Sequence, residues 1–161
     1  MSNVRKHSGF TLVELLLTLA ILAALATLAA PMLGDNDKLQ VDVTRRLLVS
    51  DLEYAQILAI SHPEDTIALV LTEGGWHIAE TETIETPLLD EITDEPIKLT
   101  LGKGPASSAF DVSIEADMEE QIIVFDQNGG LNDFTQDVEI TITSGETYSV
   151  IHISPTTGSI Q

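Results

Sequence analysis

Cysteine is absent from the 161-residue chain, and aromatic residues make up only 4% of it. The lack of cysteine excludes disulfides and thiolate-bound metals. With so few aromatic rings, a hydrophobic core has to be built mainly from Ile, Leu and Val. The length is sufficient for one domain with an additional element.

Basic residues are also scarce, with 7 Lys and Arg against 26 Asp and Glu and a formal net charge of −19. A chain this acidic repels nucleic-acid phosphates and anionic lipid head groups, so we expect no nucleic acid as a partner of its soluble part. The charge favours solubility, cationic partners or divalent ions instead. It is unevenly distributed, because Glu14 is the only acidic residue before Gly34.

The N-terminal region contains a long uncharged stretch, residues 15–33. As a helix, this stretch would be roughly 28 Å long, close to the thickness of a bilayer core. Arg5 and Lys6 precede it and should stay cytoplasmic, which directs the rest of the chain across the membrane. A cleaved secretory signal peptide is the alternative. However, Pro31 directly follows the small residues 29–30 and makes a poor cleavage site.

The junction before this stretch carries the most specific motif. Residues 6–14 read Lys-His-Ser-Gly-Phe-Thr-Leu-Val-Glu, a short basic leader that ends in glycine and leads into an aliphatic helix. This pattern resembles the type III signal of type IV pilins and pseudopilins. The resemblance implies that a prepilin peptidase cuts between Gly9 and Phe10 on the cytoplasmic side and methylates the new N-terminus. Residues 1–9 would then be a leader peptide.

Glu14 is the first candidate residue for assembly. A carboxylate at the start of a membrane helix is costly unless it has a partner, so it is a functional candidate by default. Cleavage after Gly9 would create a positive amine at Phe10, one helical turn away. The resemblance implies that the amine of one subunit neutralises Glu14 of a neighbour. The alternative is that Glu14 merely lies in the head-group layer.

Pro31 is the second candidate for assembly. It is the 22nd residue after the proposed cut, where pilins commonly carry a helix-bending proline. Proline removes a backbone hydrogen bond inside a helix, and a membrane tolerates this only where neighbouring helices compensate. A simple helix end is the alternative, since residues 34–37 read Gly-Asp-Asn-Asp. The pattern leaves both a kink and a break open.

An amphipathic helix is predicted within residues 34–63, because apolar residues recur at helical spacing and Pro63 follows. Its expected apolar face consists of Leu39, Val43, Leu48, Leu52, Ala55 and Ala59. Together with the transmembrane and assembly helix expected at 10–33, it would form a stem of roughly 75 Å. One half would lie in lipid and the other half under a head.

Residues 64–161 change to a period of two, which predicts β-strands separated by glycine-containing turns. The strand candidates are 67–71, 76–79, 97–101, 110–114, 122–125, 138–142 and 148–153. These short strands, with no helix between them, predict an α+β fold in which the long N-terminal helix packs on one sheet of a small antiparallel β-sandwich. That is the pilin-like fold.

Three head segments resemble the GspH/FimT branch of minor pseudopilins. They are Asp-Leu-Glu-Tyr-Ala-Gln at 51–56, Ile-Val-Phe-Asp at 123–126 leading to Gly-Gly at 129–130, and Ile-Ser-Pro-Thr-Thr-Gly at 153–158. DNA-uptake members of the branch carry basic residues near the C-terminus, whereas this chain ends Ser-Ile-Gln at 159–161. This departure again argues against nucleic acid as a partner.

No catalytic residue, metal site or cofactor is predicted. The histidines are His7, His62, His77 and His152; they form no metal-spaced pair, and the HExxH and G-x-S-x-G motifs are absent. We expect His77 and His152 on sheet faces. Trp76 is expected to pack over the core rather than stack on a ligand.

Two acidic segments are weighed as ligand sites. Residues 80–95 hold seven acids and no base, and a solvated loop between strands is favoured over a partner-recognition loop or a calcium site. Residues 126–133 faintly resemble a calcium loop. A hairpin turn is favoured there, because the full acidic series and the terminal glutamate are missing.

These features predict a minor pseudopilin and not an enzyme. It would be a single-pass inner-membrane prepilin with a periplasmic head, processed by prepilin peptidase and assembled with other pseudopilins into the pseudopilus of a type II secretion system. The first alternative is a minor pilin of a type IV pilus, with an adhesion or assembly-priming role. The second is a membrane-anchored enzyme or carbohydrate-binding domain.

Overall fold

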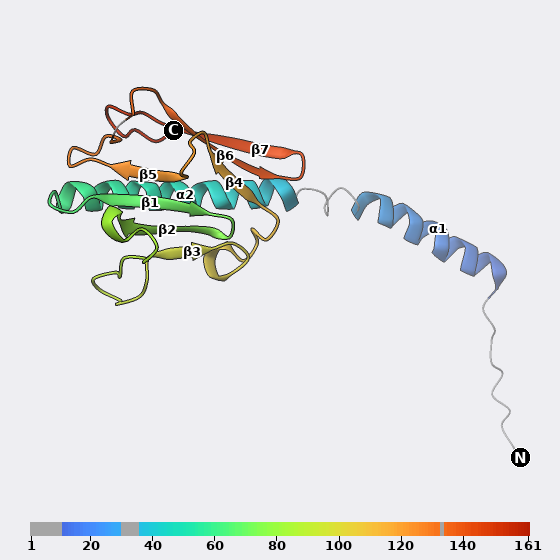
Figure 1. Ribbon diagram of the computed structural model, residues 1–161. Coiled ribbons are helices and arrows are strands. Elements are labelled where there is room, and N and C mark those ends of the chain that lie inside the picture. The colour runs from blue at the N-terminus through green and yellow to red at the C-terminus, as the bar shows by residue number, and fades with distance from the viewer. Residues whose placement is uncertain (1–10, 30–35, 133) are drawn as a thin grey trace, which may run out of the picture. The chain divides into compact units, whose positions relative to one another are not determined.

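The computed structural model describes residues 11–29, 36–132 and 134–161, which belong to two units divided after Asn36 (Figure 1). The described part of the first unit is helix α1, Leu12–Ala29. Its leucines and alanines are strong helix formers. Both ends of the helix predicted at 10–33 lie outside the described residues, so the continuous stem remains a prediction.

Helix α2, Asn36–Ser61, confirms the predicted amphipathic helix and ends before Pro63. Its buried positions include Val41, Thr44, Leu48, Leu52, Ala55 and Ala59. Two predicted face positions are wrong, because Leu39 is 54% exposed and Val43 is only half-buried. Successive residues of a helix are rotated by about 100° around its axis. The five-residue step from Val43 to Leu48 therefore places these two side chains about 140° apart around the helix, on different faces. Steps of three and four residues from Val41 stay on one stripe.

The second unit contains seven strands in two antiparallel sheets. The four-stranded sheet has the order β3-β2-β1-β5, and the three-stranded sheet has the order β4-β6-β7. The strands are β1 Ile67–Thr72, β2 Gly75–Glu80, β3 Lys98–Thr100, β4 Ser113–Ala116, β5 Ile122–Phe125, β6 Val138–Ser144 and β7 Thr147–Ile153. Single 3-10 turns lie at η2, Thr81–Thr83, and η3, Gly104–Ala106. The predicted α+β fold is confirmed.

One predicted strand begins later than expected. Residues 110–112 were expected to be extended, but β4 starts at Ser113 and the Phe110 side chain is 72% exposed. The backbone N–H of Asp111 donates to Oε1 of Gln40 on α2 at 2.9 Å. The chain therefore pairs with a helix side chain at this point and joins the sheet only afterwards.

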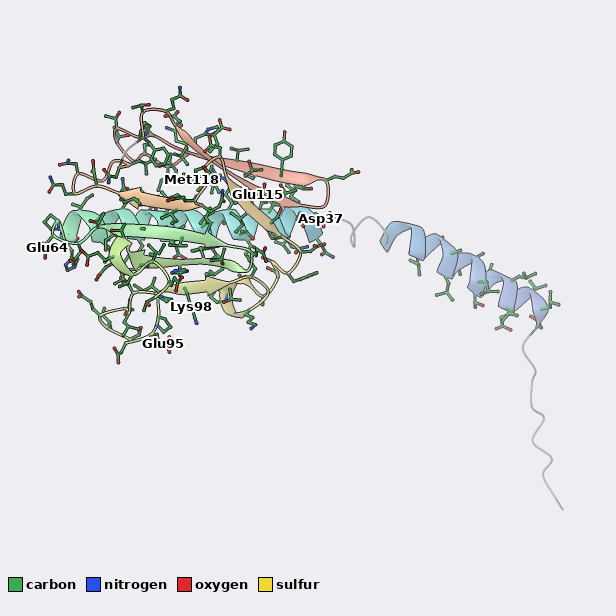
Figure 2. All side chains as sticks on the ribbon, viewed as in Figure 1. Asp37, Glu64, Glu95, Lys98, Glu115 and Met118 are labelled. Carbon is green, nitrogen blue, oxygen red and sulfur yellow. The ribbon has the colours of Figure 1, made fainter. Side chains whose placement is uncertain are left out.

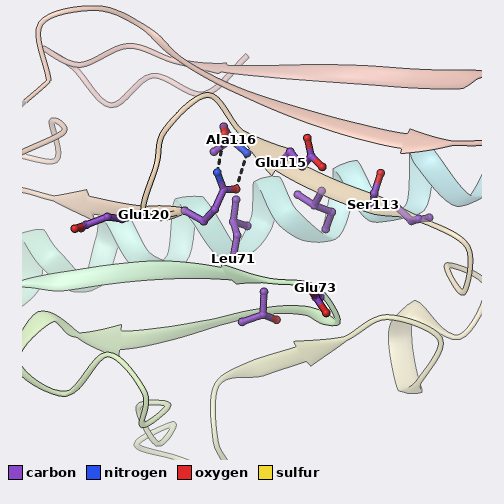
Figure 3. Close-up of a pocket in the computed structure, with 10 residues that line it drawn as sticks. Leu71, Glu73, Ser113, Glu115, Ala116 and Glu120 are labelled. Atoms are coloured by element: carbon purple, nitrogen blue, oxygen red, sulfur yellow. Dashed lines mark hydrogen bonds between the residues drawn. The ribbon is translucent and has the colours of Figure 1, made fainter.

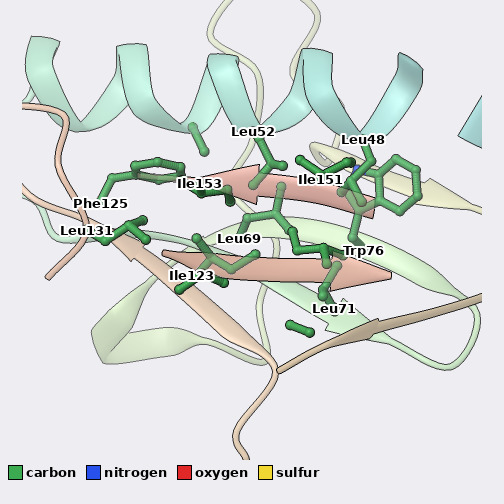
Figure 4. Close-up of a cluster of buried hydrophobic side chains, with 14 of the residues drawn as sticks. Leu48, Leu52, Leu69, Leu71, Trp76, Ile123, Phe125, Leu131, Ile151 and Ile153 are labelled. Atoms are coloured by element: carbon green, nitrogen blue, oxygen red, sulfur yellow. The ribbon is translucent and has the colours of Figure 1, made fainter. Parts of the chain in front are cut away.

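Helix α2 and both sheets share one hydrophobic core, whereas we expected one sheet on the helix (Figure 4). Leu48 and Leu52 of α2 pack with residues of both sheets, such as Leu69 of β1 and Ile151 of β7, and all four are fully buried. Burying one such side chain stabilises the fold by about 1.5–3 kcal/mol. The core is mainly aliphatic, as the composition predicts.

Candidate functional site

Glu14 is the only described residue among the four predicted for processing and assembly; Gly9, Phe10 and Pro31 lie outside the described residues. It lies in the first turn of α1, and its backbone N–H donates to Oγ1 of Thr11 at 3.2 Å. This bond caps the helix, and the Thr-x-x-Glu spacing is that of a capping box. A carboxylate there also interacts favourably with the helix dipole. Glu14 therefore has a local role that the sequence argument did not include.

The described side chains of α1, up to Leu25, are predominantly apolar and exposed. Among residues 12–25, for which side-chain exposure is described, the large hydrophobic residues are each at least 52% exposed: Leu12, Val13, Leu15, Leu16, Leu17, Leu19, Ile21, Leu22 and Leu25. A helix that is apolar all round needs an apolar environment. Within the described ranges, no helix has the combined length and apolarity needed to cross a membrane.

In the head, Gln56 of α2 lies where the three branch-like segments meet. Its side-chain Nε2 donates to the carbonyl of Gly129 at 2.7 Å and lies 3.2 Å and 3.3 Å from the carbonyls of Gly158 and Thr157. An amide nitrogen has two N–H donors, so the three contacts share them. The side chain of Gln56 thus contacts both the turn that follows β5 and the C-terminal segment.

Two glycines allow this close approach. Gly158 has a φ of 61°, and a Cβ at this position would collide with the backbone carbonyl of Gly129. A Cβ on Gly130 would lie 2.8 Å from the carbonyl oxygen of Pro155. Glycine is needed where backbones pass this closely. Gly130 and Gly158 of the branch-like segments therefore have a structural explanation.

A second link joins α2 to the four-stranded sheet. Nε1 of Trp76 donates to Oδ2 of Asp51 at 2.6 Å, and Trp76 is 2% exposed, as predicted for a core residue. Burial raises the pKa of the Asp51 carboxyl, and the Trp76 hydrogen bond partly offsets the rise. Asp51 therefore serves as an anchor for a buried indole.

The acidic segment 80–95 runs from the end of β2 into the loop before β3, as expected, and Glu95 projects outward from it (Figure 2). Within it, Oδ1 of Asp90 accepts hydrogen bonds from the backbone N–H groups of Ile92 and Thr93, at 3.0 and 2.8 Å. These bonds hold the pKa of Asp90 below its usual range. Asp90 thus stabilises a turn of its own loop.

The histidines make local contacts. His77 and His152 lie on β2 and β7 as predicted; Nε2 of His77 is 2.7 Å from the carbonyl of Ile84, and Nδ1 of His152 is 3.4 Å from Oε1 of Glu139. His62 lies beside Glu64 and Asp65, a grouping that we did not predict, with one possible ligand atom from each within 4.8 Å of the others. All three follow α2 directly in sequence, and exposed acids commonly gather in this way without a metal.

Residues 126–132 form the predicted hairpin turn. Oδ1 of Asp126 accepts hydrogen bonds from the N–H groups of Asn128 and Gly130 at 2.7 and 2.9 Å, and Phe125 pairs with Leu131 across the turn. The Asp126 carboxylate is thus engaged by its own backbone. The acidic pattern here has a structural explanation.

Sequence reasoning missed a groove between the two sheets. It has a volume of about 690 Å³ and lies between the end of β1 and the outer edge of β4 (Figure 3). Gln121, with a φ of 54°, closes one end of it and bonds to both sides. In the sequence, Gln121 is a single glutamine directly before a predicted strand. Such a residue does not predict a groove.

Comparisons with known proteins concern two of the features described above, the N-terminal segment and the fold. The model of the prokaryotic N-terminal methylation motif matches residues 4–30. The fold is similar to the crystal structure of the type IV minor pilin FimU of Pseudomonas aeruginosa (strain PAO1) in space group P21, with a TM-score of 0.53 and 21% identity over 77% of this chain and 88% of that chain. A second crystal form, P65, gives a TM-score of 0.50 and 19% identity over 74% and 89%.

No curated protein matches the sequence. At about one fifth identity, the likeness to FimU establishes the fold alone, while the N-terminal motif is recognised independently of it. The chain therefore carries a prokaryotic N-terminal methylation motif at residues 4–30, and its fold is the one seen in the type IV minor pilin FimU.

Proposed function

We propose that this chain is a minor subunit of a pilin-type fibre, processed between Gly9 and Phe10. The observation that carries the proposal is helix α1, which lies within the segment that the methylation motif matches, is capped at Thr11 and exposes its leucines from Leu12 to Leu25. Such a helix needs lipid or other helices around it. The inner membrane would provide the lipid before assembly, and a fibre of packed N-terminal helices would provide the neighbouring helices afterwards.

The proposed division of the chain follows from this. Residues 1–9 are the leader, 10–33 the single membrane-spanning and assembly helix, 34–63 the amphipathic half of the stem and 64–161 the periplasmic head. During assembly, the helix leaves the membrane and joins a helix bundle. The positive amine at Phe10 of one subunit then neutralises Glu14 of its neighbour, and Pro31 bends the helix or ends it.

For the machine, we propose the pseudopilus of a type II secretion system, because the three segments that meet at Gln56 resemble the GspH/FimT branch. A type IV pilus is the second candidate, and the likeness of the head to a type IV minor pilin favours it. The partners in either case are other pilin-like subunits and a prepilin peptidase. The proposed role is mechanical, with no enzymatic activity.

Processing is tested by expressing the full chain in cells with and without an active prepilin peptidase and determining the N-terminus by mass spectrometry. We expect an N-terminus at methylated Phe10 only where the peptidase is active. An intact leader in both strains, or a cut near residue 30, would overturn the proposal. Site-specific cross-linking from Leu16 on α1 in cells that carry each machine then identifies the fibre by the subunits captured.

A further inference from the structure

We propose that the groove between β1 and β4 binds an extended segment of a partner polypeptide in which apolar and basic residues alternate. The segment adds a strand to the free edge of β4. This interaction site goes beyond the proposed function and does not rest on it, because it concerns the head unit alone.

The outer edge of β4 has backbone groups available for pairing. Antiparallel pairs alternate between hydrogen-bonded and non-bonded positions. The N–H of Asp117 donates to the carbonyl of Glu139 on the β6 side at 3.0 Å, and Ile114 is paired with Ile142 at a non-bonded position. The N–H and C=O of Ile114 therefore point away from β6, towards the groove. Within the described residues they have no hydrogen-bond partner.

The hydrogen bonds that Gln121 makes to Ala116, drawn as dashed lines at Ala116 in Figure 3, show how a strand would fit there. The Gln121 side-chain amide makes both hydrogen bonds that a neighbouring strand would make to Ala116: the Ala116 N–H donates to Oε1 and Nε2 donates to the Ala116 carbonyl, each at 2.8 Å. Its backbone carbonyl accepts from the N–H of Leu71 on β1 at 2.9 Å. Gln121 thus bridges the two sheets at one end of the groove. The next position along the edge, Ile114, is left open.

The lining of the groove specifies the chemistry of the occupant. Side chains alternate between faces along a strand, so Val112, Ile114 and Ala116 share the face that packs against the core, while Glu115 points outward and is exposed. Glu73 also lines the groove and is exposed.

Glu120 is the third acid, and no Lys, Arg or His lines the groove among the described residues. A strand inserted there would place alternate side chains against apolar atoms and the others beside carboxylates. Alternating apolar and basic residues satisfy both faces.

A second copy of this chain is a poor occupant. Acidic side chains on an edge strand discourage its pairing with the same strand of another copy. If two β4 edges paired, Glu115 of one copy would lie near Glu115 of the other, and the two carboxylates would repel each other. A cationic partner benefits from the same charges. The groove volume of about 690 Å³ falls within the roughly 300–1,000 Å³ typical of ligand sites.

The test uses the full chain in neutral detergent and a capped six-residue peptide of alternating valine and lysine. Two control peptides are used: one keeps the lysines and has proline in place of valine, and the other keeps the valines and has glutamate in place of lysine, which reverses its charge. We expect the valine–lysine peptide to bind and to slow hydrogen exchange of the Ile114 amide. The proline control, which cannot pair as a strand, should bind about tenfold more weakly. The glutamate control should not bind.

Two variants locate the site. Ile114→Pro removes the edge N–H while leaving the bonds to β6, and should weaken binding about tenfold. The double change Glu73→Lys with Glu115→Lys alters only exposed side chains and should abolish binding, whereas Glu146→Lys, in the β6–β7 turn, should not. No binding by the valine–lysine peptide would overturn the proposal. Two other results would also overturn it. One is a proline control that binds as tightly as the valine–lysine peptide, and the other is a peptide that slows hydrogen exchange elsewhere but not at the Ile114 amide.

Discussion

The indole Nε1 of Trp76 donates a 2.6 Å hydrogen bond to Oδ2 of Asp51, which joins β2 to α2 at the edge of the hydrophobic core. Trp76 is 2% exposed and Asp51 is half-buried. A buried indole N–H needs an acceptor, and a half-buried carboxylate needs a donor. Each residue therefore satisfies the other, and the pair holds the helix against the four-stranded sheet.

Replacing Trp76 with Phe should destabilise the protein by about 1–3 kcal/mol, because the carboxylate of Asp51 loses its donor in a partly desolvated position. The measurement is urea unfolding of the detergent-solubilised chain followed by circular dichroism. Tyr148→Phe is the control, since Tyr148 is 70% exposed and should change stability by less than about 0.5 kcal/mol. Equal effects of the two changes would contradict the assigned role of the pair.

Asp51 should also make stability depend on pH. Its folded-state pKa is raised by burial above the ordinary value of 3.8, so the folded protein holds this proton more tightly than the unfolded chain. The resulting stability is present below 3.8 and is lost as pH rises through the folded pKa. Relative to Asp51→Asn, the wild type should therefore lose stability as pH increases across this window.

The difference between the wild type and Asp51→Asn is the quantity to measure, because it removes the common effect of the many other carboxylates. Unfolding free energies at several pH values from 3.5 upward, about one pH unit apart, provide it. A difference that does not change with pH would show that Asp51 has the same pKa in both states. A change of opposite sign would show that the Trp76 bond outweighs burial.

The sequence predicted the elements of the head well, because period-two alternation and glycine turns are local signals. All seven strands form, and α2 ends before Pro63 as expected. The errors arose where a tertiary contact decides the outcome. Asp111 bonds to Gln40, which delays β4, and Thr44 is buried on the helix stripe that was assigned to Val43.

The convergence at Gln56 could not be predicted, although each contributing segment had been noted. Hydrogen bonds from one side chain to Gly129 and Gly158 join positions 73 and 102 residues away, and no local pattern encodes such a distance. The β1–β4 groove was missed for a similar reason. It exists because Gln121 turns the chain between two sheets, and the sequence does not specify how two sheets diverge.

Gly158→Ala should be strongly destabilising, because a Cβ there would collide with the backbone carbonyl of Gly129. Gly104→Ala is the matched control: it has a similar positive φ of 52°, but nothing lies within 4 Å of the added atom. The control should therefore lose only the cost of the left-handed backbone, about 1–2 kcal/mol. Thermal unfolding of both variants measures the difference. Equal losses would show that backbone conformation, and not the close approach, requires glycine at position 158.

Glu14→Gln should separate processing from assembly. Glutamine remains acceptable at this position of a capping box, so α1 should still begin at Thr11, but the change removes the charge that would neutralise the amine of a neighbour. We expect cleavage at Phe10 to continue and incorporation into fibres to fall about tenfold or more, measured on sheared or purified fibres by immunoblot. Glu53→Gln, at an exposed position of α2, should leave incorporation unchanged.

Thr11→Ala distinguishes the two roles of Glu14. It removes the 3.2 Å capping bond to the Glu14 N–H, at a cost of about 1 kcal/mol to the helix start, and keeps the carboxylate. If the charge drives assembly, Thr11→Ala fibres should retain most of their subunits while Glu14→Gln fibres do not. Equal losses in the two variants would instead assign Glu14 to the helix start, because both would then act through the first turn of α1.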